Sequence, residues 1–115
     1  MSPARRRAGD ALRVVLVTAP PRRARGLARV LVEGRLAACV SLLRDVKSIY
    51  RWEGRVEEAA ETLLVLKTTA SRVPALIAAV KELHPYAVPE VVALPVDGAL
   101  DAYADWVRDS VTPPR

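Results

Sequence analysis

Two side chains of this sequence are ligands that transition metals favour: the thiol of Cys39 and the imidazole of His84. The chain has one cysteine and one histidine in all, so a metal site built on them needs carboxylates or a second copy of the chain. Each residue also has a simpler interpretation. Cys39 fits a small buried apolar residue, and His84 fits a helix end, where it interacts with the terminal carbonyl groups.

Three further residues indicate a polar pocket. Lys67 lies inside the apolar stretch LLVLKTT, where a cation is costly unless it is paired or borders a pocket. The segment HPYAVPE, residues 84–90, adds Tyr86 and Glu90 close to His84, between two prolines. The alternatives are a lysine that extends to solvent from the end of a strand, and a stiff loop that leads into a strand.

The stretch SIYRWEG, residues 48–54, holds two of only five aromatic residues in a chain without phenylalanine. In a strand, Tyr50 and Trp52 point to the same face, so they fill a core or cover another subunit. Glu53-Gly54 then forms a turn. The acidic residues around this turn predict a solvated edge that deters unwanted strand pairing; they are Glu53, Glu57, Glu58 and Glu61.

The apolar pattern predicts the elements that position these residues, in the order β-α-β-β-α-β-α. With right-handed crossovers, this order gives an α+β fold: a ferredoxin-like split β-α-β sandwich plus one C-terminal helix. Gly34 is expected to cap the first helix, and the prolines near the last strand favour a sheet edge. The expected strands span 12–18, 37–52, 55–69 and 88–96, and the expected helices start near 21, 71 and 99.

The second and third strands predict a long hairpin and an oligomer. Sixteen extended residues, 37–52, reach roughly 50 Å, whereas a compact domain of this length is roughly 35 Å across. Unless the chain breaks at Arg44-Asp45, the hairpin projects beyond its own domain. Because bare strand edges aggregate, a projecting hairpin indicates a closed oligomer in which neighbours cover it.

Length and charge limit the remaining possibilities. The 115 residues suit one domain at 12–110, flanked by a disordered basic tail at 1–11 and a short tail at 111–115. The net charge of +5 arises within residues 1–35, which hold nine arginines, and no nucleic-acid-binding motif accompanies it. We therefore expect no specific nucleic-acid partner. No apolar run is long enough for a membrane, and the lone cysteine favours the cytoplasm.

Four long segments carry a resemblance to a known family: LVEGRLAACVS, SIYRWEGRVEE, LLVLKTTASRVPAL and KELHPYAVPEVVALPV. Through them, and over residues 12–110, the sequence resembles the CutA divalent-cation tolerance proteins. The resemblance implies a homotrimer joined by long β-hairpins, a link to divalent metals and to copper especially, and no established reaction. It also implies a pocket between subunits, although Ala87 stands where the family often has glutamate. The pocket residues it implies are Cys39, Tyr50, Trp52, Lys67, His84, Tyr86 and Glu90.

Three functional hypotheses follow. The first is a non-enzymatic trimer of metal tolerance, without an obligatory cofactor, that binds Cu(II) weakly through His84 and Cys39 near the cleft between subunits. The second is a trimeric sensor of a small anionic metabolite, similar to the PII-type signalling proteins, with Lys67 holding the anion. The third is a cofactor-free enzyme with His84 as general base, which lacks an identifiable carboxylate to orient the imidazole.

Overall fold

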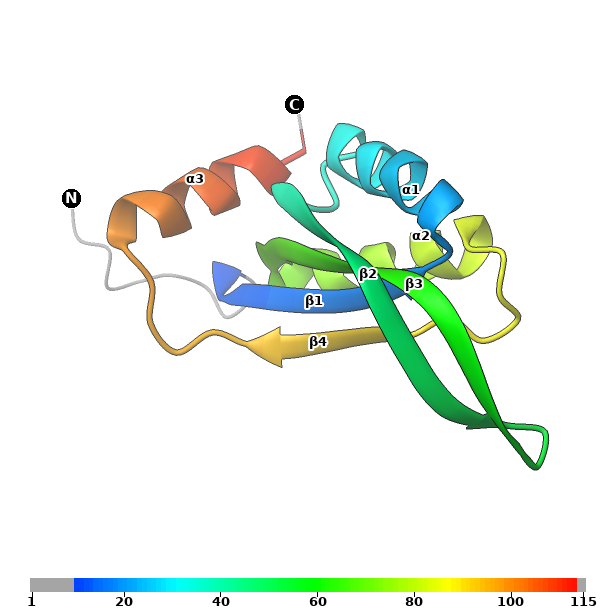
Figure 1. The fold of residues 1–115 in the computed structure, drawn as a ribbon. Helices are drawn as coiled ribbons and strands as arrows, with labels where there is room; N and C mark the ends of the chain where they lie inside the picture. The colour runs from blue at the N-terminus through cyan, green and yellow to red at the C-terminus, as the bar shows by residue number, and fades with distance from the viewer. Residues whose placement is uncertain (1–9, 114–115) are drawn as a thin grey trace.

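The computed structural model describes residues 10–113, in which four strands and three α-helices follow one another in the predicted order (Figure 1). The basic tail expected at 1–11 lies, up to residue 9, outside the described residues, as do residues 114 and 115. A short 3-10 turn, Ala70–Arg72, precedes the second helix. The elements are β1 (Leu12–Ala19), α1 (Pro21–Glu33), β2 (Cys39–Trp52), β3 (Arg55–Thr69), α2 (Val73–Leu83), β4 (Val91–Pro95) and α3 (Asp101–Val111).

The four strands form one sheet in the order β2-β3-β1-β4, and every neighbouring pair is antiparallel. This is the predicted ferredoxin-like split β-α-β arrangement, with β3 inserted between β2 and β1. The expected edge position of the last strand is confirmed. β4 pairs only with β1, and Pro95 ends it, where a missing backbone N–H costs little.

One face of the sheet carries the main core. Val15 and Val17 of β1 alternate with residues of the opposite face, and they pair with Leu66 and Leu64 of β3; all four are fully buried. α1 and α2 cover this face. The apolar stripe predicted for α1 is confirmed, and the buried helix residues are Ala24, Leu27, Ala28, Leu31, Leu76 and Val80.

The opposite face, which we call the open face, is covered at one end only. There α3 packs Ala104, Val107 and Val111 around Leu12. Farther along, Leu43, Val92 and Leu94 are between 42% and 46% exposed. A sheet face with this much exposed aliphatic surface is unusual for a free monomer.

The C-terminus of α1 differs from the prediction. Gly34 has φ −81°, and the left-handed residue is Arg35, with φ 59°. The Arg35 N–H donates to the carbonyl of Val32 and the Leu36 N–H to that of Leu31, both at 3.0 Å, which is the pattern of a Schellman motif. Gly34 is therefore the C-cap of α1, as expected, but the left-handed conformation that a glycine usually adopts falls one position later, on an arginine.

The hairpin of β2 and β3 projects from the body, as its length predicted (Figure 1). The molecule measures 55 × 28 × 22 Å, and its radius of gyration of 15.3 Å exceeds the roughly 13 Å of a compact domain of about this length. The chain does not break at Arg44-Asp45. Instead a β-bulge shifts the register between Leu43 and Val46, with Asp45 at φ 63°.

Candidate functional site

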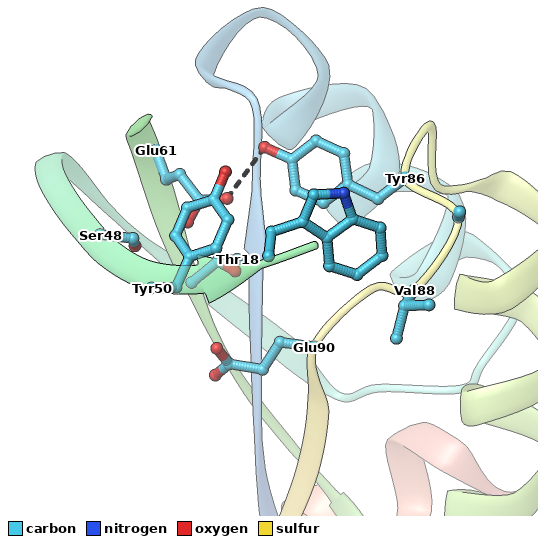
Figure 2. Close-up of a pocket in the computed structure, with 9 residues that line it drawn as sticks. Thr18, Ser48, Tyr50, Glu61, Tyr86, Val88 and Glu90 are labelled. Atoms are coloured by element: carbon cyan, nitrogen blue, oxygen red, sulfur yellow. Dashed lines mark hydrogen bonds between the residues drawn. The ribbon is translucent and has the colours of Figure 1, made fainter. Parts of the chain in front are cut away.

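A pocket of about 370 Å³ lies where the hairpin meets the loop between α2 and β4 (Figure 2). It brings together four of the predicted pocket residues: Tyr50, Trp52, Tyr86 and Glu90. The structure adds residues that the sequence did not single out for this pocket, namely Thr18, Ser48, Glu61 and Val88. Ala87 also lines it.

The bulge in β2 decides which hairpin side chains reach the pocket. After the register shift, Val46 lies opposite Glu61 and Tyr50 lies opposite Glu57. Side chains of a strand alternate between faces, so Tyr50 and Trp52 share the face of Glu61, as the sequence predicted for the two rings.

Tyr86 and Glu61 form the main polar contact of the pocket. The Tyr86 hydroxyl donates to Oε2 of Glu61 at 3.0 Å (Figure 2). Burial, and then this hydrogen bond to the carboxylate, raise the pKa of Tyr86 to about 12. Glu61 is only 4% exposed. Its assignment to a solvated acidic edge was therefore wrong, whereas Glu53 and Glu58 are exposed as predicted.

His84 lies behind the pocket and holds its loop in place. The imidazole is buried, and its Nε2 donates to the carbonyl of Thr18 at 2.7 Å. Nδ1 accepts the backbone N–H of Tyr86 at 3.1 Å, and the two rings pack with centroids 4.6 Å apart. Both nitrogens thus hold backbone groups, which leaves neither free as a general base or a metal ligand without a rearrangement.

Cys39 and Lys67 lie together but away from the pocket. They are opposite each other in the β2–β3 register. Lys67 Nζ donates to Ser41 Oγ at 3.0 Å and to the carbonyl of Val65 at 3.3 Å. Thr18, which His84 contacts, pairs with Leu63, four residues from Lys67, or roughly 13 Å along the strand. One chain therefore does not bring Cys39 and His84 together.

Cys39 has a different neighbour, Tyr103 of α3. Its Sγ lies 3.6 Å from the Tyr103 hydroxyl. Burial, and then the hydrogen bond to Cys39, raise the pKa of Tyr103 to about 12. The thiol is half-buried, which is close to the simpler interpretation of Cys39 as a small packing residue.

The charge of the pocket suits a cation. Glu61 and Glu90 line it, and none of its nine lining residues is a lysine or an arginine. Between residues 10 and 113, no three histidine, cysteine or acidic side chains cluster closely enough to hold a metal ion. A metal bound here by protein side chains alone would therefore need ligands from a second subunit.

The fold and the pocket define a small ferredoxin-like protein with a ligand-sized cavity beside a projecting hairpin. The family to which such a protein belongs follows from its sequence. The family model described as CutA1 divalent ion tolerance protein matches residues 13–110, so the chain belongs to that family.

Relatives support this assignment. The divalent-cation tolerance protein CutA of Thermus thermophilus is 51% identical over 98 residues, which cover 84% of this chain and 95% of the relative. Human protein CutA is 50% identical over 80% of this chain, but the match spans only 52% of the human protein. A solved structure described as the PII-like protein CutA from Nostoc sp. PCC 7120, in apo form, is 37% identical with a TM-score of 0.83, over 87% of this chain and 97% of that one.

None of the helices between residues 10 and 113 is long and apolar enough to cross a bilayer.

Proposed function

We propose that this protein is a non-enzymatic, cytoplasmic homotrimer that takes part in divalent metal-ion tolerance by binding Cu(II) weakly at the cleft between subunits. The observation that carries the proposal is the acidic pocket. Glu61 and Glu90 offer carboxylate oxygens, and no cationic side chain lines the pocket. Membership of a divalent-ion tolerance family supports the same class of ligand.

The exposed apolar surface supports the homotrimer. Leu43, Val92 and Leu94 leave the open face uncovered, and Ile49 and Val56 of the hairpin are about two-thirds exposed. A closed oligomer would bury both surfaces and would place the hairpin of one subunit against the next. The pocket, which lies beside the hairpin, would then border a neighbouring chain.

The predicted ligands His84 and Cys39 fit this proposal in different ways. His84 would have to give up the Thr18 carbonyl or the Tyr86 N–H before it could bind Cu(II), which accepts imidazole and carboxylate ligands. Cys39 would have to come from a neighbouring subunit. Glu90 is exposed and needs no such rearrangement, so we expect it to contribute most.

A calorimetric titration of the tag-free protein with Cu(II), with Zn(II) as the control metal, tests the site. Three variants separate the candidate ligands: Glu90→Gln, His84→Ala and Cys39→Ser. We expect saturable Cu(II) binding at a whole number of ions per trimer, weakened about tenfold or more by Glu90→Gln, because each lost ligand removes a charge-assisted contact. No binding, or binding unchanged in all three variants, would rule out this site.

The resemblance to a structure described as PII-like supports a second candidate, a sensor of a small anion. Lys67 is the residue to test, because its ammonium group lies on the open face with Ser41 rather than in the acidic pocket. Phosphate, citrate and nucleotide would then raise the melting temperature saturably, and Lys67→Ala would remove the effect. Stabilisation by Cu(II) alone would leave the metal proposal standing.

A further inference from the structure

A second hollow, of about 290 Å³, lies on the helical side of the molecule, between the start of α1 and the end of α2. Figure 1 shows these two helix ends side by side. We call it the α1–α2 groove. It is on the opposite side of the sheet from the open face, so a trimer packed through that face leaves it accessible. Its lining residues are Arg22, Arg23, Gly26, Leu27, Val30, Leu83 and Pro85.

The centre of the α1–α2 groove is apolar and uncovered. Leu27 is buried at its base, whereas Val30 is 49% exposed and Leu83 is 42% exposed. These residues come from both helices and line the same hollow, so apolar side chains face it from two sides. Surface of this kind on a helical layer matches the apolar anchors that groove-binding peptides use.

The two arginines at one end of the groove are placed against the preference of the helix. Arg22 and Arg23 lie in the first turn of α1, where cations oppose the helix dipole, and this turn holds no acidic residue. Within residues 10–113, neither arginine forms an ion pair, and the nearest acidic residue along the helix, Glu33, is paired with Arg29. Their charge is therefore free for a partner.

Gly26 is the third unusual feature. A glycine inside a helix costs about 1 kcal/mol relative to alanine. The packing of the chain does not require this one, because a Cβ atom added at Gly26 would meet nothing within 4 Å and the backbone is ordinary helix. Because Gly26 has no side chain, the groove has a low wall at this position, and the backbone of another chain can approach it closely.

We propose that the α1–α2 groove binds an acidic peptide segment of a partner protein. Carboxylates of the segment pair with Arg22 and Arg23, and one or two apolar side chains lie over Leu27, Val30 and Leu83. An anionic membrane would use the arginines but has no need of a concave surface or of the low wall at Gly26. This inference goes beyond the proposed metal function and does not depend on it.

The probe is an array of peptides about 12 residues long that combine Asp or Glu with two Leu or Phe residues at helical spacing. Peptides with Lys in place of the acids, or Ser in place of the apolar residues, are the controls. The best binder is then measured in solution by fluorescence anisotropy. We expect a dissociation constant in the micromolar range for acidic-apolar peptides and none measurable for either control set.

Two variants test the site without endangering the fold. Arg22→Glu with Arg23→Glu puts acids where the dipole favours them, and Gly26→Leu replaces a poor helix former with a good one, so neither should lower the melting temperature. We expect each to weaken peptide binding about tenfold or more. Arg25→Glu, on the same turn but outside the groove, is the matched control and should change binding less than about twofold.

Three results would overturn the proposal. They are the absence of any acidic-apolar binder at millimolar peptide, equal losses with Arg25→Glu and the groove variants, and full binding in Gly26→Leu. Equal losses in Arg25→Glu and in the Arg22→Glu, Arg23→Glu variant would show attraction by the net charge of the helix, as expected for anionic vesicles. Retained binding in Gly26→Leu would place the peptide elsewhere.

Discussion

At the scale of single residues, the pocket depends on a short chain of hydrogen bonds. Thr18 of β1 accepts from His84, His84 accepts from the backbone of Tyr86, and Tyr86 donates to Glu61 of β3. Three separate segments are thus tied by two side chains. His84 acts here as a brace, which explains why the chain buries its one imidazole.

The hydroxyl of Tyr86 gives a pH-dependent prediction. Its pKa rises from 10.0 to about 12 in the folded protein, so the contribution is complete below pH 10 and is lost as the pH rises towards 12. We expect the free energy of unfolding to fall over this range, and to fall less steeply in Tyr86→Phe. Urea denaturation between pH 8 and 12 measures both. Tyr103→Phe is the variant for comparison, because the pKa of Tyr103 is also raised to about 12 but at a site away from the pocket. It measures how much of the fall in stability comes from that second tyrosine. Identical slopes for wild type and Tyr86→Phe would contradict the prediction.

At the scale of elements, the tip of the hairpin is less favourable than it could be. Trp52 pairs with Arg55, so Glu53 and Gly54 form a two-residue turn with φ 50° and 78°. Two positive φ angles define a type I′ turn, for which Asn-Gly is preferred and a glutamate is strained.

Glu53→Asn is therefore expected to stabilise the protein by about 0.5 to 1 kcal/mol, because asparagine tolerates the left-handed conformation better. Gly54→Ala should destabilise it by about 1 kcal/mol, since alanine resists φ 78°. Chemical denaturation at one fixed protein concentration measures both changes. A loss of stability in Glu53→Asn would mean that the glutamate makes a contact in the oligomer that outweighs the strain.

The same elements show how far sequence reasoning reached. The order of strands and helices, the edge strand and the length of the hairpin all follow from local patterns of apolar residues and prolines. Which side chains meet across the sheet does not follow from those local patterns. Lys67 was expected in the pocket and Glu61 in solvent. In the structure, Tyr86 of the loop before β4 donates to Glu61, and Lys67 donates to Ser41 of β2. These contacts join segments far apart in the sequence, which local patterns do not reveal. Arg35 likewise replaced Gly34 as the left-handed residue because the Schellman geometry starts one position later.

At the scale of the whole molecule, one chain leaves too much apolar surface uncovered. Besides the α1–α2 groove, exposed apolar side chains lie on the open face and on the hairpin. Trp52 near the hairpin tip is 44% exposed, and Leu94 on the open face is 42% exposed. A closed oligomer would bury the open face and the hairpin together if the hairpin of one subunit packed against the next subunit.

Trp52→Ala tests that arrangement, because buried tryptophans often dominate the energy of an interface. We expect the variant to dissociate at protein concentrations where the wild type keeps the mass of three chains, as measured by sedimentation velocity over a dilution series. Arg51→Ala is the control, since Arg51 is exposed and points to the other face of the same strand. A mass that stays that of a trimer in Trp52→Ala at the lowest concentration would count against the role of Trp52.

The bulge between Leu43 and Val46 makes the length of β2 as important as its composition. Counting from the body of the sheet, the extra residue sets the parity of every position out to the tip. If β2 paired regularly through Arg44 and Asp45, every later residue would slip by one position, and Ile49 and Arg51 would take the face that Tyr50 and Trp52 now share with Glu61. An in-frame loss of the Asp45 codon would remove the extra residue and let β2 pair regularly with both rings still on the pocket side, so it is the bulge that reconciles the length of this strand with the aromatic wall of the pocket.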